Sequence, residues 1–182
     1  MAIYTYCTQE FGFRRWAVDL LSIGCLESAH LRLLDRPRRE YEELLCARLL
    51  EGFDAVSSLF TSFVDTQISP RLGGIFKCQN PPVFRVQLSG SESISQIHRD
   101  RDHGLSPEAV NIWVPLTDTS GANSLWIESA EGAGDFKPVT LRYGEYLQFD
   151  GANLAHGSVR NTTEISRVSF DFRVLPQYFT AI

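Results

Sequence analysis

The sequence predicts a mainly β protein with N-terminal helices, whose strands form a jelly roll or a related β-sandwich. Three observations lead to this fold class. Residues 1–70 have a helical character, and from Tyr41 onward apolar residues recur every three or four positions, which is the spacing of one helix face. After Pro70, short runs rich in Val, Phe, Trp, Tyr and Ile are separated by turn residues. No helical pattern interrupts these runs, and many short strands without intervening helices are typical of two packed sheets.

The helices are predicted from this apolar spacing. Short helices are expected over residues 13–21 and 26–34. Asp35 can cap the start of a longer helix, and Pro37 suits its first turn, where backbone N–H groups lack helical partners. From Tyr41 onward, the apolar residues of this longer helix share one face: Leu45, Leu49, Phe53, Val56, Phe60 and Phe63.

The strands are predicted from residue type and punctuation. They are expected near residues 83–89, 93–99, 110–117, 123–128, 138–142, 145–149, 155–160 and 166–175. The chain has 182 residues, of which 43% are hydrophobic, which suits one core but would be short for two. We therefore expect a single domain over residues 1–182, with a helical flank (1–70) and a jelly-roll core (71–182).

Composition narrows the classes of function. The formal net charge is −5, whereas nucleic-acid surfaces concentrate positive charge, so no nucleic-acid partner is expected. No apolar run approaches the length of a membrane span, and no signal-peptide pattern opens the sequence. The four cysteines are scattered without a CxxC pair, which favours reduced thiols. We expect a cytoplasmic protein without a membrane partner.

Potential metal ligands crowd into the stretch SISQIHRDRDHGLS. His98 and Asp100 are two residues apart, so on a strand they would lie on the same face. A third ligand can come from His156, in GANLAHGSVRN. Two histidines and one carboxylate occupy one face of a metal ion and leave other positions open, which is the arrangement of non-haem Fe(II) oxygenases. Asp102 has the same parity as Asp100, and His103 follows it, so a shifted ligand set is the alternative.

A second polar pair lies on the last predicted strand. Arg167 and Ser169 share one face of this strand, while the apolar residues between and after them share the other. A guanidinium can grip a carboxylate with two parallel hydrogen bonds, and a buried arginine without such a partner would be costly. We therefore expect a carboxylate ligand beside Arg167. Arg160 and Arg173 compete for this role, and Arg160 can instead bind an acidic group of a substrate.

The set His98-x-Asp100, His156 and Arg167-x-Ser169 resembles the Fe(II)/2-oxoglutarate-dependent oxygenases, and within them the phytanoyl-CoA dioxygenase-type superfamily. The segment IHRDRDHGLSPEAVNIWVPLTDTSGANSLWIES, followed by RVSFDFRV, is similar in sequence to oxygenases of streptomycin-type antibiotic biosynthesis. The resemblance covers residues 83–175. It implies a double-stranded β-helix, which is another name for this cupin-like jelly roll.

The resemblance also implies a chemistry. His98, Asp100 and His156 would ligate Fe(II), with 2-oxoglutarate and O2 as cosubstrates. The distal carboxylate of 2-oxoglutarate would pair with Arg167, helped by Ser169. A C–H bond of a small polar metabolite would then be oxidised, by hydroxylation or by a related desaturation, epimerisation or cyclisation. Related halogenases carry a small residue at the position of Asp100, so halogenation is not expected. The chain lacks a long insertion between strands, so we expect a monomer or a homodimer with a contact near the site.

Other polar residues of the predicted strands are candidates for the pocket wall. Those expected to contact the cosubstrate are Gln87, Asn111 and Asn123. Those expected to contact the substrate are Arg85, Trp113, Asp102 and Arg160. Two rival functions fit the same residues. One is a non-catalytic cupin-like binding module, and the other is a metal-dependent oxygenase that does not use 2-oxoglutarate, in which Arg167 would be structural.

Overall fold

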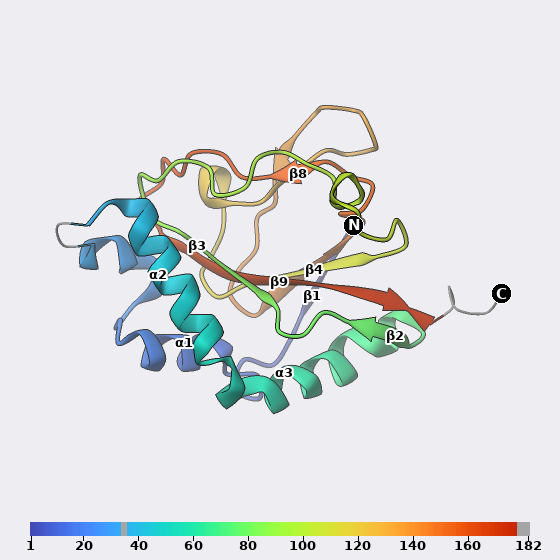
Figure 1. Ribbon diagram of the computed structural model, residues 1–182, viewed down its shortest axis with the longest axis horizontal. Helices are drawn as coiled ribbons and strands as arrows, with labels where there is room; N and C mark the ends of the chain where they lie inside the picture. Colours follow the sequence, from blue (N-terminus) through green and yellow to red (C-terminus); the bar gives the residue numbers. More distant parts are fainter. Residues whose placement is uncertain (34–35, 178–182) are drawn as a thin grey trace.

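The computed structural model describes residues 1–33 and 36–177. Within these residues the strands form one six-stranded and one three-stranded antiparallel sheet (Figure 1). The larger sheet contains β1 (Ala2–Thr5), β7 (Glu145–Phe149), β4 (Val110–Pro115), β9 (Arg167–Pro176) and β2 (Ile75–Cys78), in that order, and β3 (Val83–Gln87) also pairs with β9. The smaller sheet contains β6 (Lys137–Pro138), β5 (Trp126–Ile127) and β8 (His156–Gly157). The mainly β character predicted from the sequence is therefore confirmed.

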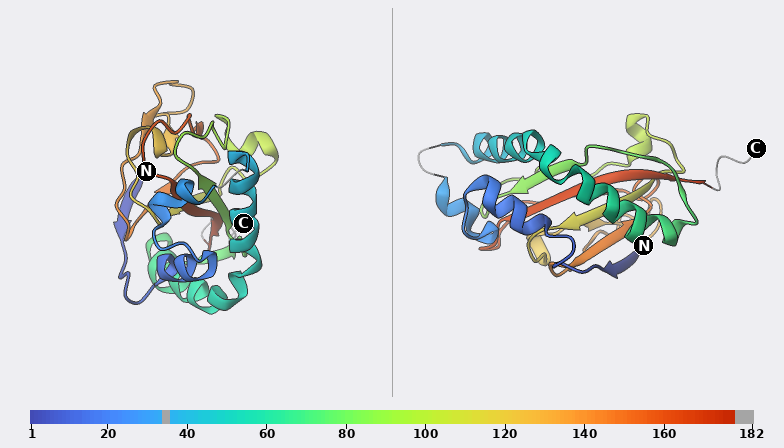
Figure 2. Two further views of the ribbon diagram at one scale, coloured as in Figure 1. Left: turned by 90° about the vertical axis from the view of Figure 1, so that its left-hand side faces the viewer. Right: turned by 90° about the horizontal axis from the view of Figure 1, so that it is seen from below.

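The elements are arranged in layers. The helices cover one face of the larger sheet, and β8 of the smaller sheet lies over the other face (Figure 1); Figure 2 shows the same arrangement from two more sides. The helices are α1 (Phe13–Leu21), α2 (Arg38–Glu51) and α3 (Ser57–Phe63). Between the helices and the sheet lies the main core, where Phe170 contacts Phe13 and Phe60. A smaller apolar cluster joins Trp113 and Phe149 of the larger sheet to Ile127 of the smaller one.

Strand β9 separates an apolar environment from a polar one. Val168, Phe170 and Phe172 lie in the main core, as strand alternation predicts. The residues that alternate with them from position 167 to position 173 lie on the other face and are polar: Arg167, Ser169, Asp171 and Arg173. The apolar face is stabilised by burial against the helices, so the polar row is left facing the smaller sheet. This row forms one wall of the candidate site.

The helical part differs from the prediction in its continuity. The expected apolar face is confirmed, since all six of its residues from Leu45 to Phe63 are buried. The expected single helix is wrong: α2 ends at Glu51, a 3₁₀ turn covers Phe53–Val56, and α3 follows. Gly52 at the break is a poor helix former. Pro37 precedes the first helical residue, and the predicted cap Asp35 lies outside the described residues. Among the described residues, no helix combines the length and apolarity that a membrane span needs.

The strand predictions agree best with the larger sheet. The predictions at 83–89, 110–117, 145–149 and 166–175 correspond to β3, β4, β7 and β9. In the smaller sheet, β5 and β8 are two residues long, so the runs predicted at 123–128 and 155–160 are too long. The strand predicted at 93–99 is wrong, because this segment is irregular apart from one isolated bridge at His98. The four-residue strands β1 and β2 are missing from the prediction, and the helix expected at 26–34 is a 3₁₀ helix over Leu26–Arg32.

Candidate metal centre

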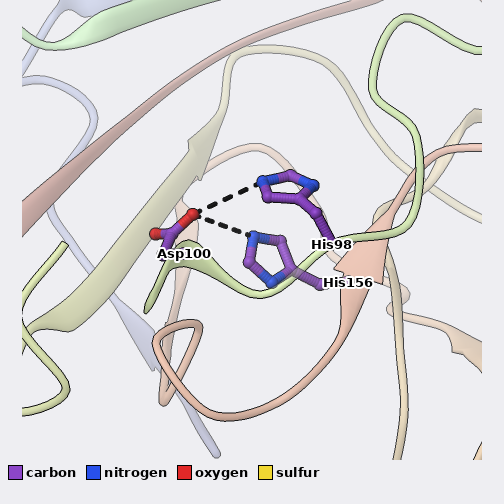
Figure 3. Close-up of side chains that lie close together, drawn as sticks. All are labelled: His98, Asp100 and His156. Atoms are coloured by element: carbon purple, nitrogen blue, oxygen red, sulfur yellow. Dashed lines mark ion pairs between the residues drawn. The ribbon is translucent and has the colours of Figure 1, made fainter. Parts of the chain in front are cut away.

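His98, Asp100 and His156 converge beside the polar face of the larger sheet (Figure 3). The backbones of His98 and His156 form an antiparallel bridge, with N–H···O distances of 3.0 and 2.9 Å. Asp100 begins a 3₁₀ turn, and its N–H donates to the carbonyl oxygen of Gly151 at 3.0 Å. His98 and Asp100 therefore meet through a bridge followed by a turn, and not through alternation along a strand.

The three side chains present one potential ligand atom each to a common centre. Nε2 of His98 lies 3.4 Å from Oδ1 of Asp100, and Nε2 of His156 lies 3.8 Å from the same oxygen. All three ligand atoms lie within 4.8 Å of one another. Asp100 is 1% exposed and His156 is 5% exposed, whereas His98 is half-buried at the edge. The cluster is thus buried on one side and accessible on the other.

Hydrogen bonds orient both imidazole rings so that Nε2 of each faces the common centre. Nδ1 of His98 lies 2.8 Å from the carbonyl oxygen of Gln96, and Nδ1 of His156 lies 3.0 Å from that of Leu154. A carbonyl oxygen can only accept, so each Nδ1 carries the proton and each Nε2 offers its lone pair to the centre. Burial lowers the pKa of His156 and so favours its neutral form. Both rings are therefore oriented as ligands before any metal binds.

Asp100 is held in its ionised form by two neighbours on the larger sheet. Arg173 donates from Nε to Oδ2 at 2.8 Å and from Nη2 to Oδ1 at 3.2 Å, and Nδ2 of Asn111 donates to Oδ2 at 2.7 Å. Burial alone would raise the pKa of Asp100, but these hydrogen bonds outweigh it, and the pKa is lowered. Two imidazole nitrogens and one ionised carboxylate form a donor set that fits a divalent first-row transition metal.

Gly151 leaves room for the asparagine that orients Asp100. A Cβ atom at Gly151 would lie 2.5 Å from Nδ2 of Asn111. We therefore expect Gly151→Ala to displace this amide and to weaken Co(II) binding by about tenfold, the lower end of the effects seen for groups that orient metal ligands. Calorimetric titration with Co(II) measures the change. Gly12→Ala is the matched control, because nothing lies within 4 Å of its added Cβ. Unchanged affinity in Gly151→Ala would contradict the role of Asn111.

A chain of ion pairs continues from Asp100 along the polar face. Arg173 also donates from Nη1 to Oδ2 of Asp171 at 3.0 Å, and Arg85 of β3 donates from Nε to Oδ1 of Asp171 at 2.7 Å. Arg85 and Arg173 are therefore both neutralised by carboxylates. Asp171 is absent from the candidates predicted from the sequence. It lies two residues after Ser169, so strand alternation places it on the same face as Arg167 and Ser169, and this signal could have identified it.

Arg167 is in a different state from these two arginines. It is 2% exposed, its Nη1 donates to the backbone oxygen of Asn123 at 3.0 Å, and its Cζ lies 5.9 Å from the centroid of the Trp113 ring. Among the described residues, neither its Nε nor Oγ of Ser169 has a hydrogen-bond partner. Burial lowers the pKa of Arg167 to about 10, so the guanidinium stays charged at neutral pH. A buried charge with free donors fits a carboxylate ligand.

One pocket connects the ligand cluster to Arg167. Its empty volume is about 420 Å³ including the open space at its mouth, and its lining includes His98, His156, Trp113 and Arg167. A larger and more open cleft, of about 1400 Å³ including its mouth, shares His98 with this pocket. The lining of the cleft also includes Asp100, Arg173, Lys77, His103 and Leu105. The centre therefore faces both a narrow pocket that leads to a buried cation and a wide cleft.

The remaining predicted residues have varied environments. Gln87 is buried beside Arg167, and its Nε2 donates to the carbonyl oxygens of Glu92 and Val159. The side chain of Asn123 closes the turn that starts at Ser120, so only its backbone oxygen reaches Arg167. Arg85, Asn111 and Trp113 line the narrow pocket. Asp102 and Arg160 are exposed and line neither the pocket nor the cleft.

Similar proteins are found by sequence and by fold. No protein-family model matches the chain. Over 130 residues it is 43% identical to the streptomycin biosynthesis protein StrG of Streptomyces griseus, a match that spans 71% of this chain and 61% of StrG.

Two solved structures show the fold. HygX from Streptomyces hygroscopicus, solved with nickel and 2-oxoglutarate bound, has a TM-score of 0.54 at 13% identity, over 97% of this chain and 82% of HygX. AviO1 from Streptomyces viridochromogenes Tue57 has a TM-score of 0.52 at 16% identity, over 95% of this chain and 87% of AviO1. The chain is therefore a homologue of StrG, and its fold is similar to those of HygX and AviO1.

Proposed function

We propose that this protein is an Fe(II)- and 2-oxoglutarate-dependent oxygenase that oxidises a C–H bond of a small polar metabolite in natural-product biosynthesis. One observation carries the proposal: a single pocket joins the two histidines of the cluster, which also holds Asp100, to a buried, charged arginine whose Nε has no partner among the described residues. The homology to StrG supports a role in antibiotic biosynthesis. The similar fold of HygX, which was solved with nickel and 2-oxoglutarate bound, supports the proposal that this protein binds a metal together with 2-oxoglutarate.

In this proposal each residue has a defined task. When bound, Fe(II) with 2-oxoglutarate and O2 would supply the oxidising power that breaks a C–H bond. His98 and His156 bind the metal through Nε2, and Asp100 binds it through a carboxylate oxygen. Arg173 and Asn111 orient Asp100. Because these ligands are already turned toward one point, little side-chain ordering remains to be done when the metal binds.

Arg167 is proposed to bind the distal carboxylate of 2-oxoglutarate, with Ser169 as a second donor. The two competing arginines are engaged elsewhere: Arg173 is paired with Asp100 and Asp171, and the side chain of Arg160 is 62% exposed and faces Glu92. A carboxylate beside Arg167 would accept from groups that otherwise stay buried without partners. The burial of the guanidinium excludes water and strengthens the ion pair.

The substrate is proposed to approach through the wide cleft, because the cleft reaches His98 and Asp100 from the open side of the centre. Arg85 and Trp113 line the narrow pocket and can contact the part of the substrate nearest the metal. Contacts of Asp102 or Arg160 with the substrate stay predictions that the pocket linings do not support. Within this proposal the fold is a double-stranded β-helix of the phytanoyl-CoA dioxygenase type that forms a single domain. The protein acts in the cytoplasm, as a monomer or homodimer, on a small molecule.

An anaerobic titration tests the proposal. Purified apoprotein is mixed with Fe(II) and then with 2-oxoglutarate, and the weak visible charge-transfer band of the chelated keto acid is recorded. The proposal expects the band in the wild-type protein and its loss in His156→Ala. Metal binding without the band would favour an oxygenase that does not use 2-oxoglutarate. Absence of metal binding would leave a cupin-like binding module.

A further inference from the structure

The two chain segments that carry the ligands meet at one buried carboxylate outside the ligand set. Glu128 directly follows β5 and is 1% exposed. The N–H of Ala155 donates to its Oε1 at 2.7 Å, and Nη2 of Arg99 lies 3.2 Å from the same oxygen. Ala155 directly precedes His156, and Arg99 lies between His98 and Asp100. One oxygen atom therefore bonds to the immediate chain neighbours of all three candidate ligands.

Further hydrogen bonds make this junction rigid. The N–H of Glu128 donates to the carbonyl oxygen of Ala155 at 3.1 Å, and Nε of Arg99 donates to that of Asn153 at 3.0 Å. The other carboxylate oxygen of Glu128 accepts from the N–H of Gly134 at 3.2 Å. Hydrogen bonds from backbone N–H groups, chiefly that of Ala155, lower the pKa of Glu128 to about 2, so it is ionised at neutral pH. A buried carboxylate bonded by several donors costs much to disturb.

A neighbouring ion pair provides a natural comparison. Arg101, just after Asp100, pairs with Glu131, three residues after Glu128, but their side chains are 35% and 54% exposed. Exposed pairs of this kind contribute little to structure because water and salt screen them. The buried pair of Arg99 and Glu128 and the exposed pair of Arg101 and Glu131 therefore separate the effect of burial at the junction from the effect of charge.

We propose that Glu128 is a positioning residue of the metal centre: its carboxylate joins the segment of His98 and Asp100 to the segment of His156, and so sets the separation of the three ligand atoms. The orientation of His156 depends on this junction directly, because its Nδ1 donates to the carbonyl oxygen of Leu154, next to Ala155. The inference rests on the proposed metal centre. The inference adds to this centre a residue, Glu128, that lines neither the pocket nor the cleft.

Glu128→Gln tests the inference, because the glutamine has the same size but carries no charge and puts an N–H group among donors. We expect Co(II) binding to weaken by about tenfold or more, and the ligand-field absorption bands of bound Co(II) to shift. Glu131→Gln should change neither quantity. Circular dichroism and thermal unfolding of the apoproteins show whether each variant is folded. A folded Glu128→Gln variant with unchanged affinity and an unchanged Co(II) spectrum would overturn the proposal.

A second variant covers the case in which Glu128→Gln does not fold. Arg99→Gln leaves the bond between Glu128 and Ala155 in place and removes the two bonds that Arg99 makes, one to Glu128 and one to the carbonyl oxygen of Asn153. We expect the Arg99→Gln variant to bind Co(II) more weakly and to shift its absorption bands, whereas the control Arg101→Gln should change neither. Wild-type affinity and spectrum in Arg99→Gln would overturn the proposed link between the two segments. If the wild-type protein itself bound no Co(II), the proposed metal centre would fail together with this inference, whereas normal wild-type binding with unchanged variants would overturn the inference alone.

Discussion

His156→Ala is expected to abolish both metal binding and turnover while leaving the fold intact. The substitution removes one of three ligand atoms from a site that needs deprotonated ligands in a fixed arrangement. The backbone of residue 156 still exchanges two hydrogen bonds with His98, since these involve only N–H and carbonyl groups. Calorimetric titration with Co(II) and an assay of 2-oxoglutarate consumption measure the two losses.

A matched histidine substitution serves as the control. His30 lies in the helical layer, where its Nδ1 is 2.9 Å from Oγ of Ser166, away from the pocket. His30→Ala should therefore bind Co(II) as the wild type does. Full retention of Co(II) binding in His156→Ala would show that the cluster is not the metal centre, and would return attention to His103 as a ligand.

Arg167→Met is expected to weaken 2-oxoglutarate binding about ten- to a hundredfold, because a hydrogen bond to a charged group is worth about 1.5–3 kcal/mol. The apoprotein should nevertheless be at least as stable as the wild type. Methionine fills similar space without a buried charge, and replacing buried charges by apolar side chains is often neutral or stabilising. The variant thus separates cosubstrate binding from folding.

Thermal unfolding with and without 2-oxoglutarate, in the presence of Co(II), measures both effects at once. A ligand that binds only the folded state raises Tm by mass action, so the rise expected in the wild type should be largely lost in Arg167→Met. Arg101→Met, at an exposed arginine, is the control and should keep the rise. An undiminished rise in Arg167→Met would move the carboxylate site to Arg160 or Arg173.

Local patterns explain which parts of the fold could be predicted. Alternation along a strand depends only on backbone geometry, so the polar and apolar faces of β9 follow from its residues. The apolar face of the residues 41–63 follows from helical spacing in the same way, although the break at Gly52 does not. These patterns hold because each depends on neighbours a few positions away in the sequence.

The partners of the site residues could not be predicted, because they depend on which strands pair. The pairing of Arg173 with Asp100 requires β9 to lie beside β4, where Arg173 is opposite Asn111. Strand alternation likewise does not predict that Arg160 pairs with Glu92. His98 and Asp100 lie close together, but a bridge and a turn bring them together and not alternation along a strand. Residue types indicate which side chains are candidates, and tertiary contacts decide which of Arg160, Arg167 and Arg173 has no carboxylate partner among the described residues.

The unlike faces of β9 also couple correct folding to the presence of the site. If β9 slipped by one residue against β4, every side chain would change faces. Arg167 and Arg173 would then be buried among phenylalanines from the helices, and Phe170 and Phe172 would fill the pocket. Such a chain would lose its core and its ligand pocket in the same event. Misregistered forms are therefore unstable, and any molecule stable enough to persist presents the polar row to the candidate metal centre.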